Sequence, residues 1–386
     1  MRWKIWRTKI FRRDQKVSST KLNAADPVKI GTKTAKNRIT MAPTVKFAAG
    51  EDGCVTPEFV AHYEDRAKHE CGFICVEATC VNKNGRLAPS QLGLWDDSQI
   101  EGHKRLTDAC HKYGALVVPQ LHHGGVGTHP ACGEAVGPSE VMWGFGPRER
   151  QVRALSVSEI KQIVDDFAKA AERAQKAGYD GVQLHGCHSY IINDFASDLN
   201  HRTDEYGGDV KGRAKFGCDV IKAIRETCGK DFIISMRTSG YDPNLEDAIA
   251  VAEEYVAAGC DYLQVSSGIA SLENFDHDES LPYNFIADLG VRFHEHFKGR
   301  VPVSCVNGFT TAEQVNYIFE NDLCDTVDLA RGLLADPALS EGILHGAPYF
   351  KCLNCKKSCA FGPQHEHVCP GAKQRNADEF PGIVPF

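Results

Sequence analysis

Eight short runs of apolar and β-branched residues recur along the chain, and longer amphipathic segments separate them. Almost continuous apolar runs are typical of strands that are buried on both faces, as in a parallel sheet. Strands that alternate with helices eight times predict an α/β fold, the (β/α)₈ TIM barrel. The runs are NRITMAP (37–43), GFICVEAT (72–79), LVVPQL (116–121), GVQLHG (181–186), FIISMRT (232–238), YLQVSSG (262–268), VPVSCVNG (301–308) and TVDLARG (326–332).

The segments between the runs have the apolar periodicity of helices that pack on a sheet. The clearest is 156–178, where Ser156 and Ser158 are both candidate N-caps and the closing glycine ends the helix. The same plan recurs in 244–262 and 310–326. A doubly wound sheet is the alternative, but no G-x-G-x-x-G follows the first run, which disfavours a dinucleotide-binding fold.

Length and composition allow one large domain. The chain has 386 residues, of which 42% are hydrophobic and 25% charged, and these are ordinary values for a globular protein. The segment 122–155 is long and rich in Gly and Pro, so we expect an active-site loop there rather than a second domain.

Net charge and the length of the apolar runs argue against nucleic acid as a partner and against a membrane span. The net charge of −7 argues against a protein that binds nucleic acid, and no apolar run is long enough for a membrane span. The first sixteen residues instead carry seven Lys or Arg and one acid. We interpret residues 1–24 as a basic, solvated extension, with a helix that binds a membrane surface or a partner as the alternative. A cleaved signal is not expected, because no apolar segment follows Arg12-Arg13.

The sixteen cysteines fall into two groups. Twelve are scattered, many of them within apolar runs, such as Cys75 and Cys305, and these are typical of small buried hydrophobic residues. Thiols in such positions indicate a reducing compartment, so we expect a cytoplasmic protein.

The other four cysteines have the spacing C-x2-C-x3-C-x9-C near the end of the chain. Three thiolates within eight residues can reach three corners of a cubane cluster, and a later one can supply the fourth. Structural zinc sites more often use two separated C-x2-C pairs. The spacing therefore favours a [4Fe–4S] cluster over zinc, with the ligands Cys352, Cys355, Cys359 and Cys369.

Polar residues gather where the predicted strands end, which is where barrels of this class place their chemistry. They are Gln120, His122, His123, His185, His188, Tyr190 and Arg237. The pair His185 and His188 has three interpretations: zinc ligands together with His122 or His123, donors to a carbonyl oxygen, or hydrogen-bonded core histidines. Tyr190 suits a proton donor, because a phenol is protonated at neutral pH.

The last two runs end in residues that suit a phosphate. Gly308 lies just before 310–314, a predicted helix N-terminus whose free N–H groups and dipole favour an anion. Arg331 can add a bidentate contact, and Gly332 follows it. The alternative is that both glycines serve turns and that the arginine makes a surface ion pair.

Seven segments follow one another in an order that resembles the Old Yellow Enzyme family of FMN-dependent ene-reductases. The chain is most similar to the branch of enoate and 2,4-dienoyl-CoA reductases, which adds an iron–sulfur cluster. The resemblance spans roughly residues 25–370, and its most specific part runs from strand four into NHRTDEYGG. The segments are NRITMAP, PQLHHGG, AVGPSEV, GYDGVQLHGCHSYIINDFASDLNHRTDEYGG, MRT, VNGF and ARGLLADP.

The resemblance implies roles at matching positions. For FMN it implies Pro43, Thr44 and Val45 against the ring, Gln120 at the pyrimidine edge, Arg237 at N1 and O2, and Asn307, Gly308, Arg331 and Gly332 at the phosphate. For the substrate it implies that His185 and His188 bind the carbonyl or carboxylate oxygen. The flavin would then give a hydride to the β-carbon of an activated alkene, and Tyr190 would protonate the α-carbon. Val45 departs from the pattern, since relatives often carry a hydrogen-bonding residue there.

The resemblance also supports the cluster, which would pass single electrons to FMN. We therefore expect an FMN-binding barrel at 25–346 and a cysteine-rich [4Fe–4S] segment at 347–386. No G-x-G-x-x-G occurs after the cysteines, so we expect a separate electron-donor protein. Direct reduction by NAD(P)H is the alternative.

Two other functions stay open at this point. Part of the same branch oxidises amines, so an amine dehydrogenase or N-demethylase is one alternative, and a zinc-dependent barrel hydrolase is the other. An enone, an enoate, a steroid-like ring or an enoyl thioester would satisfy the same histidines. A homo-oligomer is also compatible with this fold class.

Overall fold

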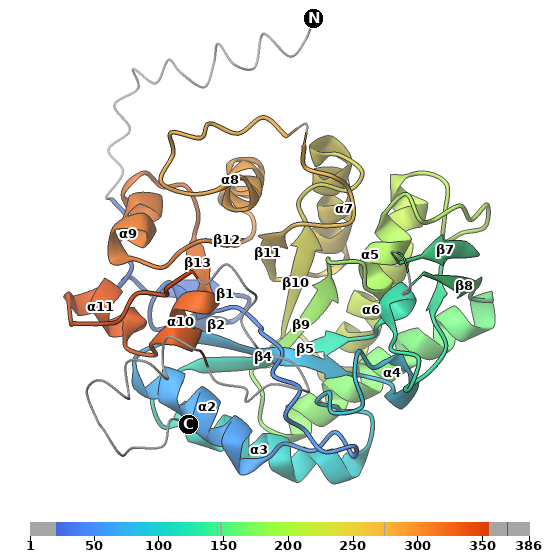
Figure 1. Cartoon of the computed structure of the whole chain (residues 1–386), viewed down its shortest axis with the longest axis horizontal. Coiled ribbons are helices and arrows are strands. Elements are labelled where there is room, and N and C mark those ends of the chain that lie inside the picture. The colour runs from blue at the N-terminus through green and yellow to red at the C-terminus, as the bar shows by residue number, and fades with distance from the viewer. Residues whose placement is uncertain (1–20, 145, 147–148, 274, 355–368, 370–386) are drawn as a thin grey trace, which may run out of the picture.

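The computed structural model describes residues 21–144, 146, 149–273, 275–354 and 369. Its centre is a closed barrel of eight parallel strands with helices around the outside (Figure 1). All eight predicted runs form these strands, which confirms the (β/α)₈ barrel. In order around the barrel they are β3 (Ile39–Met41), β4 (Phe73–Cys80), β5 (Leu116–His122), β9 (Gly181–Gly186), β10 (Ile233–Ser239), β11 (Tyr262–Ser266), β12 (Val303–Val306) and β13 (Thr326–Leu329).

The helices follow the predicted periodicity. They are α2 (Pro57–Lys68), α3 (Ile100–His111), α4 (Val157–Lys176), α5 (Ile191–Ala196), α6 (Val210–Cys228), α7 (Leu245–Ala258), α8 (Phe285–Phe297), α9 (Ala312–Glu320), α10 (Arg331–Ala335) and α11 (Leu339–His345). Of the two candidate caps of α4, Ser156 is the one used, because it forms a capping box with Glu159. Gly259 ends α7 in the left-handed conformation, at a φ of +110°.

One end of the barrel is closed by an apolar hairpin. Strands β1 (Val28–Ile30) and β2 (Lys33–Ala35) pair antiparallel, and their buried side chains pack with Phe73 and Tyr262. Burying one such large apolar side chain contributes roughly 1.5–3 kcal/mol. Phe73 opens β4 and Tyr262 opens β11, so the hairpin covers the amino ends of the strands. The carboxyl ends, where the polar residues lie, stay available for a site.

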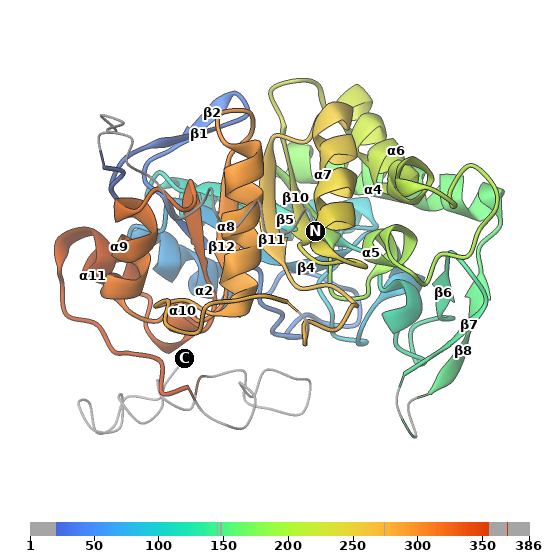
Figure 2. The same cartoon turned by 90° about the horizontal axis from the view of Figure 1, so that it is seen from above.

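The segment 122–155 has more structure than the predicted loop. It contains a 3₁₀ turn, Gly125–Gly127, and a small sheet of three strands. The strands are β6 (Val136–Gly137), β7 (Val141–Trp143) and β8 (Arg150–Ala154). Val126, Ala135 and Val152 form a separate apolar cluster beneath it. Both views show this sheet on the side of the molecule opposite α9 and α11 (Figures 1 and 2).

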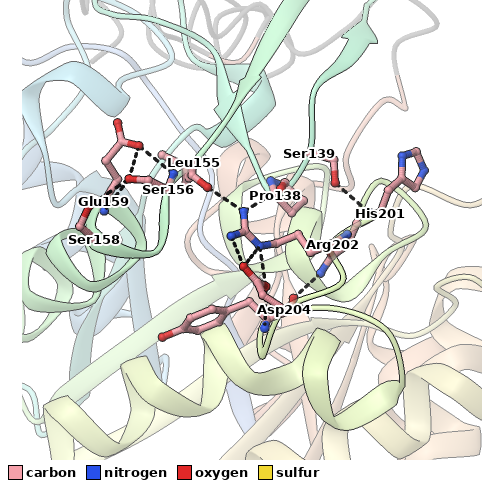
Figure 3. Close-up of polar contacts among 11 residues, drawn as sticks. Pro138, Ser139, Leu155, Ser156, Ser158, Glu159, His201, Arg202 and Asp204 are labelled. Atoms are coloured by element: carbon pink, nitrogen blue, oxygen red, sulfur yellow. Dashed lines mark hydrogen bonds and ion pairs between the residues drawn. The ribbon is translucent and has the colours of Figure 1, made fainter.

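Arg202 fastens this small sheet to the barrel (Figure 3). Its Nη1 donates to the backbone oxygens of Pro138 at 3.0 Å and Leu155 at 2.7 Å, and its Nε donates to Asp204 at 2.9 Å. The next residue back, His201, donates its backbone N–H to Ser139 Oγ at 2.7 Å. Both residues belong to the specific segment NHRTDEYGG, which lies between α5 and α6. That segment therefore has an architectural role, because it holds the small sheet against the barrel.

The scattered cysteines are free thiols throughout the described residues, and nine of these twelve are buried. Cys75 and Cys305 have no exposed surface, which confirms their interpretation as small core residues. Within the same described ranges, no helix is long and apolar enough to cross a membrane.

Candidate active site

A tight turn after β9 brings His185 and His188 together. His185 lies in the strand and is 7% exposed, whereas His188 and Ser189 follow it with φ angles of +63° and +59°. Such angles are uncommon for residues with a side chain and are typical of functional sites. The side chain of Asn193, in α5, accepts the backbone N–H of Ser189 at 3.0 Å and holds the turn. The turn folds His188 back, so that its Nδ1 lies 3.2 Å from Nε2 of His185.

Side chains from two further strands, together with Tyr190, extend this pair into a continuous cluster. Nδ1 of His122, at the end of β5, lies 3.1 Å from Nδ1 of His185. On the other side, Nε2 of His188 lies 2.9 Å from Oγ of Ser266 in β11. The ring of Tyr190 meets the rings of His122 and His185 edge-on, with centroids 4.4 and 4.5 Å apart. The predicted residues His185, His188 and Tyr190 are therefore neighbours, and the structure adds His122 to them.

Burial makes this cluster neutral at physiological pH. Burial lowers the pKa of His122 and of His185 well below the ordinary value, and the charge of Arg237 lowers that of His185 further. The same two causes lower the pKa of His188 to about 3. Burial raises the pKa of Tyr190 to about 12. The cluster therefore offers uncharged N–H donors and a phenol that keeps its proton.

Arg237, in β10, is a buried cation beside this cluster. It is 8% exposed and pairs with His185 in the strand register. Its Nη1 donates to the backbone oxygen of Pro43 at 3.5 Å, and its Nε finds no partner among the described residues. A buried guanidinium with such weak compensation favours an anionic ligand. Thr44 and Val45, which follow Pro43 after β3, are only partly buried.

A small pocket marks the ends of β12 and β13. Asn307 and Gly308 have φ angles of +91° and +82°, and a Cβ added at Gly308 would lie 2.7 Å from Nδ2 of Asn284. The predicted phosphate residues Asn307, Gly308 and Arg331 all line the pocket, while Gly332 is buried in the first turn of α10. The other lining residues are Phe309, Thr310, Asp328 and Ala330.

The predicted anion site at the N-terminus of α9 is wrong in one respect. The sequence predicts free N–H groups there, but Ala312 donates its N–H to the Tyr349 hydroxyl at 3.0 Å. A second one, from Gln314, is capped by Thr311 Oγ1 at 3.4 Å. The cationic Arg331 and the backbone around Gly308 are therefore the better candidates for holding a phosphate.

The cysteine-rich segment begins beside this pocket. Arg331 Nη1 donates to Oδ1 of Asn354 at 2.8 Å, two residues after Cys352. Cys352 and Cys369 are partly buried free thiols, whereas Cys355 and Cys359 lie outside the described residues. The described part of the segment thus meets the predicted phosphate site through one hydrogen bond.

A metal could in principle use part of the histidine cluster. One ligand atom each of His185, Cys187 and His188 lie within 4.8 Å of one another. The group contains no carboxylate, and burial raises the pKa of the Cys187 thiol to about 12. The charge of Arg237 acts on all three residues and opposes a second cation. This geometry disfavours the zinc-hydrolase alternative.

The residues present fit a flavin mononucleotide better. Arg237 supplies a buried cation whose Nε has no partner among the described residues, Gln120 in β5 supplies an amide, and the pocket at Gly308 contains the residues predicted to hold a phosphate. The neutral histidine cluster is next to Arg237, because His185 and Arg237 are register partners on neighbouring strands. These are the features that a ring, a ribityl phosphate and an uncharged substrate oxygen would need.

The sequence matches the model of the NADH:flavin oxidoreductase / NADH oxidase family over residues 25–349. An "NADPH dehydrogenase" of Bacillus velezensis is 34% identical over 79% of this chain and 89% of its own length. An "NADH oxidase" of Thermoanaerobacter brockii is also 34% identical, over 86% of this chain, but the chain spans only 53% of that relative's length.

Solved structures agree on the fold. An Old Yellow Enzyme homologue from Zymomonas mobilis has a TM-score of 0.73 at 30% identity, over 85% of this chain and 94% of its own. A 2-naphthoyl-CoA reductase has a TM-score of 0.79 at 24% identity, over 87% of this chain and 54% of its own. Fold, site and sequence agree, and the chain belongs to the NADH:flavin oxidoreductase / NADH oxidase family.

Proposed function

We propose that the protein is an FMN-dependent ene-reductase that reduces an activated C=C bond in an α,β-unsaturated carbonyl, an enoate or a steroid-like enone. The observation that carries the proposal is the cluster of His185, His188 and Tyr190, which is neutral and buried next to Arg237. Family membership supports FMN as the flavin. An amine dehydrogenase is less suited to this site, because Arg237 would repel a cationic amine.

The histidine pair would bind and polarise the substrate. N–H groups of His185 and His188 donate to the carbonyl oxygen and draw electron density from the conjugated double bond, so that its β-carbon becomes electrophilic. Donors placed at a developing enolate oxygen lower the barrier by roughly 3 kcal/mol each. Because both imidazoles are neutral, they can do this without bringing a full charge into the site.

Tyr190 would complete the reduction. Reduced FMN, when bound, supplies a hydride equivalent for the β-carbon. The Tyr190 O–H bond breaks as a C–H bond forms at the α-carbon, and the phenolate then recovers a proton from water. Hydride and proton together saturate the double bond. Arg237 would hold the negative charge of the reduced flavin, and Val45 would lie against the ring without donating a hydrogen bond.

We further propose a [4Fe–4S] cluster on Cys352, Cys355, Cys359 and Cys369. The cysteine spacing supports it, and so does the hydrogen bond from Arg331 to Asn354, which puts the start of this segment beside the phosphate pocket. Serine substitutions of Cys355 and Cys359 should remove iron but leave FMN bound. Full iron content in that double variant would contradict this assignment.

The electron source is a separate question. We propose a donor protein that reaches FMN through the cluster, while the names of the relatives, "NADPH dehydrogenase" and "NADH oxidase", support NAD(P)H. Mixing the pure protein with NADH or NADPH without oxygen decides between them. Rapid bleaching of the flavin by either nucleotide alone would rule out the need for a donor protein.

The function is tested by anaerobic purification, analysis of flavin and iron, and a screen of alkenes with a chemical reductant. We expect a flavin band at about 450 nm and turnover of at least one enone or enoate. A colourless, zinc-containing protein that binds no FMN on reconstitution would overturn the proposal.

A further inference from the structure

A polar layer crosses the interior of the barrel. Gln183, Gln264 and Asp328 come from the alternate strands β9, β11 and β13, and each is at most 2% exposed. Such a layer is usually filled by Val, Ile and Leu. Burying three polar side chains is unfavourable unless each is hydrogen-bonded, so their presence calls for an explanation beyond packing.

Hydrogen bonds join these side chains to Gln120 in one chain. Gln264 Nε2 donates to both carboxylate oxygens of Asp328, at 3.0 Å each. Gln264 Oε1 accepts from Gln183 Nε2, and Gln183 Oε1 accepts from Gln120 Nε2 at 2.6 Å. Thr40, the register partner of Asp328 in β3, also donates to that carboxylate. The chain therefore runs from the pocket at Arg331, which Asp328 lines, to the predicted flavin edge at Gln120.

The series of hydrogen bonds from Gln120 to Asp328 has a direction, and the carboxylate of Asp328 sets it. An ionised carboxylate accepts hydrogen bonds and donates none, so Gln264 must turn its NH₂ group toward Asp328. Its oxygen then faces Gln183, which must turn its own NH₂ group the same way, and Gln120 follows. The oxygen and the NH₂ group of an amide are nearly equal in size and shape, so packing alone would not choose between the two orientations of each glutamine.

Burial raises the pKa of Asp328, which would favour the neutral acid. The hydrogen bonds from Thr40 and Gln264 and the charge of Arg237 act in the opposite direction. These partners help the carboxylate to remain an acceptor, as the directional chain requires.

We propose that Asp328 is a positioning residue for the flavin: through Gln264 and Gln183 it turns the Gln120 amide so that Oε1 faces the cofactor. Oε1 of Gln120 has no hydrogen-bond partner within the described part of the chain. The pyrimidine edge of FMN carries one N–H, at N3, between two carbonyl oxygens. A Gln120 turned in this way offers an acceptor for that N–H, whereas a reversed amide would present only donors to it.

The inference rests on FMN binding, one part of the proposed function, and not on alkene reduction. The test replaces Asp328 by Leu, which is similar in size and accepts no hydrogen bond. We expect FMN to bind about tenfold more weakly to D328L, since one hydrogen bond to the flavin is lost. In NMR of the holoprotein, the N3 proton should move upfield and exchange faster with solvent.

Two further variants separate direction from packing. D328N keeps one acceptor oxygen, so its N3 proton should resemble that of the wild type. The double variant D328L/Q183E places an acceptor-only group directly beside Gln120, and it should restore the N3 signal. If D328L does not fold, Q264M breaks the series of hydrogen bonds one residue closer to Gln120. It should weaken FMN binding and shift the N3 proton as D328L does.

The outcomes are distinguishable. An N3 proton and an FMN affinity in D328L and Q264M equal to those of the wild type would overturn the inference, and so would a double variant that restores neither. A wild-type protein that binds no FMN would instead refute the proposed function, and the inference with it.

Discussion

The two ends of the predicted FMN site differ in how they are built. The histidine end, made of His122, His185, His188 and Tyr190, is largely buried and neutral, and its side chains contact one another before any ligand arrives. The phosphate end, made of Asn307, Gly308 and Arg331, is partly exposed, carries a cation and relies on left-handed backbone.

This difference teaches how one barrel mouth can serve two ligands. Neutral donors suit an uncharged carbonyl oxygen and gain strength from the low-dielectric surroundings. A partly exposed arginine beside a left-handed backbone turn suits a solvated anion. The charge of Arg237 acts on both ends: it adds to burial in lowering the pKa of His185 and His188, and it opposes the rise that burial causes in the pKa of Asp328, which lines the phosphate pocket.

The largest effect should come from Tyr190→Phe, which removes the proton donor of the histidine end. We expect kcat for alkene reduction to fall by roughly 10²–10⁴, while FMN affinity and flavin reduction stay unchanged. Separate rapid-mixing measurements of flavin reduction and of reoxidation by the alkene test this. Tyr113→Phe, at the exposed surface, is the control. Equal reoxidation rates in Y190F and the wild type would remove Tyr190 from the mechanism.

The second-largest effect should be on the free energy of unfolding, through Asp194 near the histidine end. Asp194, in α5, accepts the Val126 N–H through Oδ2 at 3.1 Å, and its Oδ1 has no partner among the described residues. Burial raises its pKa to about 8. The unfolded value is about 3.9, so between these two pH values the folded state binds more protons, and the free energy of unfolding falls as pH rises.

Asp194→Asn removes this dependence. At pH 8.5 the variant should be more stable than the wild type by roughly 5 kcal/mol, and the difference should shrink to roughly 1–2 kcal/mol at pH 5. Urea unfolding at both pH values measures it, with Asp198→Asn at the exposed surface as the matched control. A D194N difference that does not change with pH would show that Asp194 does not titrate as inferred.

The sequence predicts the barrel well, because the signal is repeated eight times and each run is buried on both faces. It also brings His185, His188 and Tyr190 together, since residues at one strand end share one rim. It does not predict β6–β8, whose strands are short and whose apolar residues are few. It also misses that Ala312 and Gln314 in α9 are already hydrogen-bonded, because Tyr349, one of the two partners, is far away in the sequence.

The polar layer leaves a signal in the sequence that apolar periodicity alone does not reveal. Gln183, Gln264 and Asp328 each interrupt an apolar run, in GVQLHG, YLQVSSG and TVDLARG. One polar residue in a strand is compatible with many roles. Only the closure of the barrel shows that the three side chains meet, because their strands are separated by β10 and β12.

A smaller effect should come from Gly308→Ala at the phosphate end. A methyl group there would lie 2.7 Å from Asn284 Nδ2, on a backbone with a φ of +82°. We expect FMN to bind about tenfold more weakly, since strain of about 1 kcal/mol and the close contact both disturb the pocket. Gly299→Ala is the matched control: its φ is +78°, but its added Cβ meets nothing within 4 Å. Equal FMN affinity in both variants would remove Gly308 from the phosphate site.

The smallest expected effect is that of pH on substrate affinity, which should stay constant if the histidine end is neutral. His188 has a pKa of about 3, and burial holds those of His122 and His185 well below the ordinary value. None of the three should therefore gain a proton between pH 5.5 and 8. The affinity of the oxidised holoprotein for an uncharged enone, measured by titration, should stay constant within about twofold over this range. An imidazolium would donate a stronger hydrogen bond, so an affinity that rose tenfold toward pH 5.5 would show that the histidine end, like the phosphate end, works by charge.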